Sequence, residues 1–275
     1  MSRDGNGSGV SSVQRALRVL EVVAAANDGI QAKAVARRLG YNLSSTYRLL
    51  NTLVAEGYLV HLGDLHGFGL GYKIPPLYQL LRERLSVGPR IANIVDQVHA
   101  ATGTAAYYSL YRGLEPVVAY VAESAGAPAI PMLEVGTAGA AHATAFGKMM
   151  LATLPAGDVL GYCETNGLTR YTEHTIGTVG DLLPQLELIR ATGLAVEIEE
   201  VATGTACMAG AVTGADGRLR ATVAVSTGLA QFHRKHPLLE NAIRQATRQC
   251  TALLRAGSAG RESPPDVPHL GVDQA

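Results

Sequence analysis

Residues 30–72 decide the fold of the N-terminal part of the chain, and they read IQAKAVARRLGYNLSSTYRLLNTLVAEGYLVHLGDLHGFGLGY. Ala34, Val35 and Leu39 recur at helical spacing before Gly40, a residue type that favours a helix end. A second apolar stripe runs on toward Gly57 and comprises Leu43, Leu49, Leu50, Leu53 and Val54. Two helices joined by a tight glycine-containing turn predict a helix-turn-helix, whose second helix either Asn42 or Ser44 can cap.

The second helix of such a motif lies in the major groove of DNA, where its N-terminal end and its solvent face reach bases and phosphates. Hydroxyl and amide side chains hydrogen-bond to base edges or phosphates, and an arginine adds a fixed positive charge. The candidate DNA contacts are Arg37 on the first helix, Ser44, Ser45, Thr46, Tyr47, Arg48 and Asn51 on the second, and His61 beyond it. The alternative is that Ser44 and Ser45 only cap a helix in an ordinary helical bundle.

The residues after the second helix favour DNA binding. Residues 58–61 are typical of a short strand, Gly63 and Asp64 of a turn, and residues 65–70 of a return strand. A hairpin directly after a recognition helix is a wing, whose tip between His61 and His66 would lie beside the DNA. Charge agrees: the chain is neutral overall, but residues 1–85 carry 10 Lys or Arg against 6 Asp or Glu.

The rest of the chain predicts a linker and a mixed domain. Residues 73–88 form the expected linker helix, because Ile74, Leu77, Leu80, Leu81 and Leu85 recur at helical spacing. Further helices are predicted at 89–102, 145–154, 182–192 and 237–254, and strands at 105–112, 116–122, 194–199, 206–212 and 219–227. Runs of strands with helices at either end indicate an antiparallel sheet flanked by helices, an α+β domain.

Several short segments, taken in order, carry a family resemblance. They are SVQRALRVL at 12–20, SSTYRLL at 44–50, GYL at 57–59, Leu70-Gly71, HATAFGK at 142–148, and Glu199-Glu200 followed by GTAC at 204–207. In this succession residues 12–254 resemble an IclR-type transcriptional regulator. The resemblance implies a GAF-like sensor domain, a helix that couples it to the DNA-binding head, and pairing of the winged heads. Leu43 is a departure, because the family often has a lysine there that would add a phosphate contact.

The resemblance also implies an effector site in the larger domain, between sheet and helices. Its candidate residues are Ala145, Phe146, Glu197, Cys207 and Ser226. Phe146 stands where the family usually has a smaller residue, so it would narrow the pocket or favour aromatic stacking. Purely structural roles are the alternative for these residues. Cys207 can be a small buried hydrophobe and Lys148 a solvated helix residue. Two of the three acids Glu197, Glu199 and Glu200 can simply face water.

Length and composition predict the organisation of the chain. A chain of 275 residues exceeds the usual size of one domain. The expected parts are a disordered tail at 1–10, a winged helix-turn-helix domain at 11–72, a linker helix at 73–88, a GAF-like effector-binding domain at 89–256 and a disordered tail at 257–275. Cys163, Cys207 and Cys250 are far apart, so free thiols are expected. No apolar run is long enough to span a membrane and no secretion signal is found, which predicts a cytoplasmic protein with no membrane partner.

The expected function is ligand-responsive control of transcription, as an activator or a repressor. The protein would bind double-stranded operator DNA as a homodimer or tetramer and would sense a small organic metabolite, an organic acid or an aromatic compound. No catalytic residue, cofactor or metal is expected. Two alternatives stay open: a sensor-type hydrolase or transferase with Cys207 as nucleophile, for which the sequence offers no nearby histidine as base, and an adaptor whose winged helix binds protein.

Overall fold

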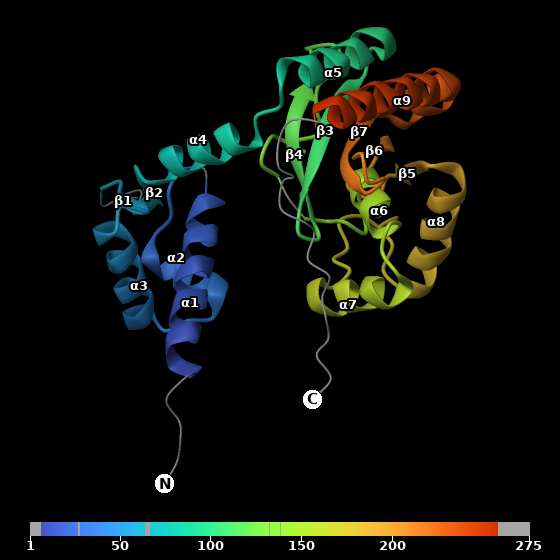
Figure 1. Ribbon diagram of the computed structural model, residues 1–275. Coiled ribbons are helices and arrows are strands. Elements are labelled where there is room, and N and C mark those ends of the chain that lie inside the picture. The colour runs from blue at the N-terminus through green and yellow to red at the C-terminus, as the bar shows by residue number, and fades with distance from the viewer. Residues whose placement is uncertain (1–6, 27, 64–66, 132, 138, 258–275) are drawn as a thin grey trace. The chain divides into compact units, whose positions relative to one another are not determined.

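The chain folds into two compact units. The computed structural model describes residues 7–26, 28–63, 67–131, 133–137 and 139–257 (Figure 1). Unit 1 covers residues 1–83 and unit 2 covers residues 84–275. The division falls inside the predicted linker at 73–88, and the predicted domain limits themselves stay a prediction.

Unit 1 is built around the predicted helix-turn-helix. Its elements are α1 (Gly7–Ala24), α2 (Ala32–Leu39), α3 (Leu43–Ala55), β1 (Leu59–His61) and β2 (Phe68–Leu70). Val19, Val35, Leu50 and Phe68 are buried in one cluster to which all three helices and the hairpin contribute. α1 starts inside the segment predicted as a disordered tail, and residues 1–6 of that segment lie outside the described residues.

The turn between α2 and α3 has the predicted chemistry. Gly40 ends α2 in the left-handed conformation with φ 67°, which an L side chain rarely adopts. Asn42 caps α3, because its Oδ1 accepts the backbone N–H of Ser45 at 2.7 Å. The predicted helix-turn-helix is therefore confirmed, with Asn42 as the cap.

The hairpin is short, and one of its glycines lies close to the backbone of the segment between α1 and α2. β1 and β2 pair antiparallel from Leu59 with Leu70 to His61 with Phe68. Gly67 has φ +76°, and a Cβ there would lie 2.4 Å from the carbonyl oxygen of Ile30. The predicted wing is thus present, while residues 64–66 at its tip lie outside the described part of the chain.

Unit 2 contains a five-stranded antiparallel sheet. α4 (Ile74–Leu85) crosses the division between the units and confirms the linker helix. Then follow α5 (Pro89–Thr102), β3 (Ala105–Arg112), β4 (Glu115–Ala122), α6 (Ala145–Leu151), α7 (Ala156–Asn166), α8 (Val179–Thr192), β5 (Leu194–Ile198), β6 (Thr205–Thr213), β7 (Leu219–Gly228) and α9 (Leu229–Gly257). The strand order is β4-β3-β7-β6-β5, and every pair is antiparallel, which confirms the α+β class.

Helices cover both faces of this sheet. α9 contacts β6 and β7 on one face and lies beside α5, while α6 contacts β5, β6 and β7 on the other (Figure 1). Side chains of β3 therefore divide between two cores: Ala105 and Tyr107 join the cluster around α6, and Tyr108 lies near Cys250 of α9. No described helix has the length and apolar character that crossing a membrane requires.

Two elements differ from the prediction. α7 was not predicted, although Val159, Tyr162 and Cys163 are buried at helical spacing. α9 begins at Leu229, not at Pro237, which lies inside the helix. A proline usually disrupts a helix, but Phe232, which is 2% exposed, anchors the turns before it in the core. His233 and His236 therefore lie inside α9.

Candidate DNA-binding surface and effector site

One face of α3 presents polar side chains to solvent. Ser44, Tyr47, Arg48 and Asn51 are all exposed, and their spacing of three and four residues places them on one side of a helix. Among the described residues Arg48 forms no ion pair, so its guanidinium is available to an outside partner. This is the geometry that a recognition helix requires. Ser45 is half-buried at the edge of the same face.

Thr46 is not part of this surface, which corrects the expectation that it faces solvent. Its side chain is fully buried, and its hydroxyl donates to the carbonyl oxygen of Asn42 at 3.0 Å. Thr46 lies on the same stripe as Leu50 and Leu53, four and seven residues further on, and all three are buried. The residue therefore supports the start of α3 from inside the core.

The two remaining candidates flank α3. Arg37 is exposed in the last turn of α2. His61 is exposed at the end of β1, where its ring lies 4.4 Å from that of Phe68. Both side chains are thus accessible to solvent, and their contacts with DNA stay predictions.

In unit 2, three of the predicted effector residues form a row across the sheet. Glu197 of β5 pairs with Cys207 of β6, and Cys207 pairs with Ser226 of β7. Directly paired residues of an antiparallel sheet point to the same face, so the three side chains share the face that α6 covers. Ala145 and Phe146 lie in the buried cluster on that face, together with Cys207.

Tyr107 of β3 lies beside this row and contacts Ser226, although it is not among the predicted effector residues. Its hydroxyl lies 2.8 Å from Ser226 Oγ and accepts the backbone N–H of Ile130 at 3.0 Å. Burial raises the pKa of the Tyr107 phenol to about 12, so the group stays a neutral hydrogen-bonding partner. The available signal was strand alternation, which places Tyr107 on the same face as Ala105, the residue paired with Ser226.

A buried ionic cluster adjoins the row. Lys148 of α6 is 0% exposed, which makes the expectation of a solvated residue wrong. Its Nζ donates to Glu200 Oε1 at 2.5 Å and to Gln185 Oε1 at 2.8 Å. Glu197 Oε2 in turn accepts the backbone N–H of Glu200 at 3.0 Å. Glu197 and Glu200 are both buried and Glu199 is half-buried, so the expectation that two of the three acids face water is also wrong.

Burial shifts the acids of this cluster toward their neutral forms. Desolvation raises the pKa of both Glu197 and Glu200, and the Lys148 ammonium offsets only part of the shift. Desolvation, with the neighbouring Glu197 carboxylate, raises the pKa of the Cys207 thiol well above its ordinary value. All three cysteines are free, as predicted, and Cys207 here is a neutral thiol.

The pKa shift of Glu197 predicts a dependence of stability on pH. The folded state holds the proton of Glu197 to higher pH than the unfolded chain does, so this residue lowers stability as pH rises above about 4.5. Glu197→Gln removes that loss. We expect the melting temperature of the variant, relative to the natural chain, to increase as pH rises from 4.5 through the raised pKa of Glu197 and then to level off, in thermal unfolding.

The matched control is Glu164→Gln, which changes an exposed acid of α7. Its melting temperature relative to the natural chain should stay constant across the same pH range. A difference for Glu197→Gln that is constant with pH, or that falls, would contradict the proposed protonation.

A cavity of about 310 Å³ opens beside the row. Ala105, Ile130, Ala202, Thr205 and Ser226 are among the residues that line it. Of the predicted effector residues only Ser226 reaches this cavity, while Ala145, Phe146, Glu197 and Cys207 lie in the closed core beside it.

Comparisons with known proteins agree with this arrangement. A family model described as "Bacterial transcriptional regulator IclR C-terminal" matches residues 82–252, and one described as "IclR helix-turn-helix domain" matches residues 12–63. The chain is 25% identical over 219 residues to the HTH-type transcriptional regulator XynR of Escherichia coli (strain K12). The alignment covers 79% of this chain and 86% of XynR. It is 27% identical over 223 residues to the HTH-type transcriptional repressor AllR of Klebsiella pneumoniae, in an alignment that covers 79% of this chain and 80% of AllR.

A solved structure shows the same fold. It is an IclR homolog from Microbacterium hydrocarbonoxydans, crystallised with 4-hydroxybenzoate, and it aligns with a TM-score of 0.64 at 20% identity. The alignment covers 89% of this chain and 99% of that chain.

Proposed function

Because the chain belongs to the IclR family of DNA-binding transcriptional regulators, we propose that it binds operator DNA as a homodimer and that a small organic metabolite in unit 2 controls this binding. Family membership makes the protein a regulator and not an enzyme, which removes the hydrolase or transferase alternative. It likewise favours DNA over protein as the partner of the winged helix. We place this regulator in the cytoplasm, where operator DNA is accessible.

The polar face of α3 is the observation that carries the DNA-binding proposal. Ser44, Tyr47, Arg48 and Asn51 offer hydroxyl, guanidinium and amide donors on one exposed helix face. Such groups read base edges in the major groove and position the helix on phosphates. We propose that Ser45, Arg37 and His61 add contacts at the borders of this surface.

Exposed apolar side chains support the dimer. Val13 and Leu17 of α1 are 61% and 52% exposed, and Leu77 and Leu80 of α4 are 51% and 52% exposed. Large apolar groups gathered on a helix face are unfavourable in water and mark interaction sites. Sedimentation velocity should give the mass of two or four chains, and a single chain at micromolar concentration would argue against the dimer.

The effector proposal rests on the neutral donors of the sheet row. Tyr107, Cys207 and Ser226 present two hydroxyls and a thiol on one face, next to the cavity of about 310 Å³. Apolar pockets with a few convergent polar groups are typical small-molecule sites. A ligand that reached Cys207 in the closed core would displace the Phe146 side chain of α6. Ligand binding and movement of α6 would therefore be linked. The 4-hydroxybenzoate in the Microbacterium protein supports an organic acid or aromatic compound as the class.

Variants of the row separate effector response from DNA binding. We expect Cys207→Ser and Ser226→Ala to bind a selected genomic DNA fragment within about twofold of the natural chain when no effector is present. The effector concentration that changes binding by half should shift at least fivefold, as expected for loss of about 1 kcal/mol from a hydrogen bond. Fluorescence anisotropy with a panel of organic acids, including 4-hydroxybenzoate, measures both quantities.

The control for this experiment is Leu160→Ala, which changes an exposed residue of α7 away from the row. An effector response that is the same in all variants would overturn the assignment of the row. Loss of DNA binding together with loss of the cooperative unfolding transition would show misfolding, and the milder Ser226→Thr then provides the test.

A further inference from the structure

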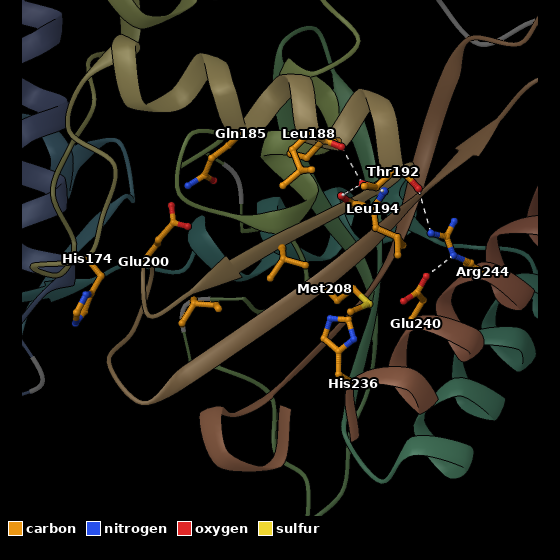
Figure 2. A pocket seen from close by; sticks show the side chains of 13 residues that line it. His174, Gln185, Leu188, Thr192, Leu194, Glu200, Met208, His236, Glu240 and Arg244 are labelled. Carbon is orange, nitrogen blue, oxygen red and sulfur yellow. Dashed lines mark hydrogen bonds and ion pairs between the residues drawn. The ribbon is translucent and has the colours of Figure 1, made fainter. Parts of the chain in front are cut away.

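A second cavity, of about 610 Å³, runs along the outer strand of the sheet (Figure 2). Leu194 and Val196 of β5 and Met208 of β6 form an apolar surface within it. Leu188 of α8 and His236 of α9 lie on its two sides. This volume is within the range of roughly 300–1,000 Å³ that small-molecule sites occupy.

This cavity is separate from the proposed effector site. Leu194, Val196 and Ile198 line it, whereas the alternate residues Ala195 and Glu197 point to the face that α6 covers. Successive side chains of a strand point to opposite faces. A ligand here would therefore lie across the sheet from Cys207 and Ser226.

One end of the cavity contains an acid with an unused oxygen. Glu200 lines the cavity although it is only 5% exposed. Its Oε1 binds Lys148, and the backbone N–H groups of Ile176 and Ile198 stabilise the carboxylate, but its buried Oε2 has no hydrogen-bond partner within ordinary geometry among the described residues. Glu197 Oε1 is also without a partner in that part of the chain, and Lys148 forms an ion pair with Glu200 and not with Glu197. A buried acceptor without a donor is costly, and a donor from outside would relieve the cost.

Arg244, Glu240 and His174, which also line the cavity, already have partners within the protein. Arg244 donates to Glu240 Oε1 at 2.8 Å and to the carbonyl oxygen of Thr192 at 3.1 Å, as Figure 2 shows. His174 lies 3.7 Å from Glu199. The cavity therefore combines an apolar surface with an acceptor at Glu200 that lacks a donor, which favours a ligand with a cationic head and an apolar body.

We propose that this cavity is a second small-molecule site, which binds an organic amine. The ammonium group donates to Glu200 Oε2, and the apolar body lies on Leu194, Val196 and Met208. Because Oε2 is buried, this contact requires the Glu200 carboxyl to rotate about its terminal bond, a torsion with broad freedom. The apolar part of this site lies on the opposite face of the sheet from the effector row, and Glu200 and Gln185 are its contacts with the cluster that adjoins the row.

Calorimetric titration of the full chain with n-hexylamine tests the proposal, with n-hexanoate as the matched anionic probe. We expect saturable binding of hexylamine and at least tenfold weaker binding of hexanoate. Val196→Trp fills the cavity and should weaken hexylamine at least tenfold. The control is Val121→Trp on β4, the opposite edge strand, where the valine is likewise half-buried; it should change binding less than twofold.

A surface variant covers the case in which Val196→Trp does not fold. Leu188 is 63% exposed, so Leu188→Lys is compatible with folding and places a cation beside the cavity. Hexylamine binding should weaken at least threefold in this variant. The proposal is overturned if hexylamine shows no saturable binding to the natural chain, or if it binds Leu188→Lys and any folded Val196→Trp as tightly as the natural chain.

Discussion

Replacing Arg48 with Ala is expected to weaken operator binding by about tenfold to a hundredfold. Arg48 is exposed on the polar face of α3 and has no ion-pair partner among the described residues. An arginine that contacts a base edge is worth about 1–3 kcal/mol in DNA binding. Anisotropy titration of a labelled genomic fragment at fixed salt gives the affinity directly.

The control for Arg48→Ala is Arg234→Ala, which removes the same charge from an exposed position of α9 in unit 2. Its affinity for the fragment should remain within about twofold of that of the natural chain. Equal losses in the two variants would mean that only net charge matters and would remove Arg48 from the recognition surface.

The second large effect concerns stability. Lys148→Met is expected to lower the free energy of unfolding by about 3–5 kcal/mol, because breaking a buried pair leaves an uncompensated charge. Lys148 is fully buried and binds both Glu200 and Gln185. Urea denaturation at pH 8 measures the loss, and adding Glu200→Leu to the variant should recover much of it because the unpaired acid is then gone.

An exposed ion pair provides the matched control. Lys73 lies 3.8 Å from Glu56, and both side chains are more than half exposed. Lys73→Met should therefore change the free energy of unfolding by no more than about 1 kcal/mol. A loss for Lys148→Met that is as small as this would show that the cluster around Glu200 is solvated and would weaken the case for an unpaired acceptor there.

Local sequence patterns were sufficient for most of the fold. Gly40, the Asn42 cap and the apolar stripe of α3 each determine local geometry, so the helix-turn-helix was predictable from adjacent residues. The antiparallel sheet was predictable from runs of strand-forming residues with helices at either end. The predicted last helix begins only at Pro237, because proline favours the first turn of a helix. Burial of Phe232, a tertiary effect, extends α9 back to Leu229.

The sites were less predictable, because their residues depend on partners distant in the chain. Lys148 is polar in a helix whose residues are all buried, and its partner Glu200 comes from the loop after β5. Nothing near Lys148 in the sequence indicates that pairing. Thr46 is different, because its position on the stripe of Leu50 and Leu53 indicates burial from the sequence alone.

Binding of genomic DNA fragments by the full chain across a salt series tests the central claim most directly. The account predicts that a selected fragment binds at low salt and that its affinity falls steadily as salt rises, because cationic side chains displace counterions from phosphates. The slope should be shallower for Arg48→Ala and unchanged for Arg234→Ala. If no duplex binds at low ionic strength, with or without candidate organic acids, the proposed docking of α3 in the major groove is wrong.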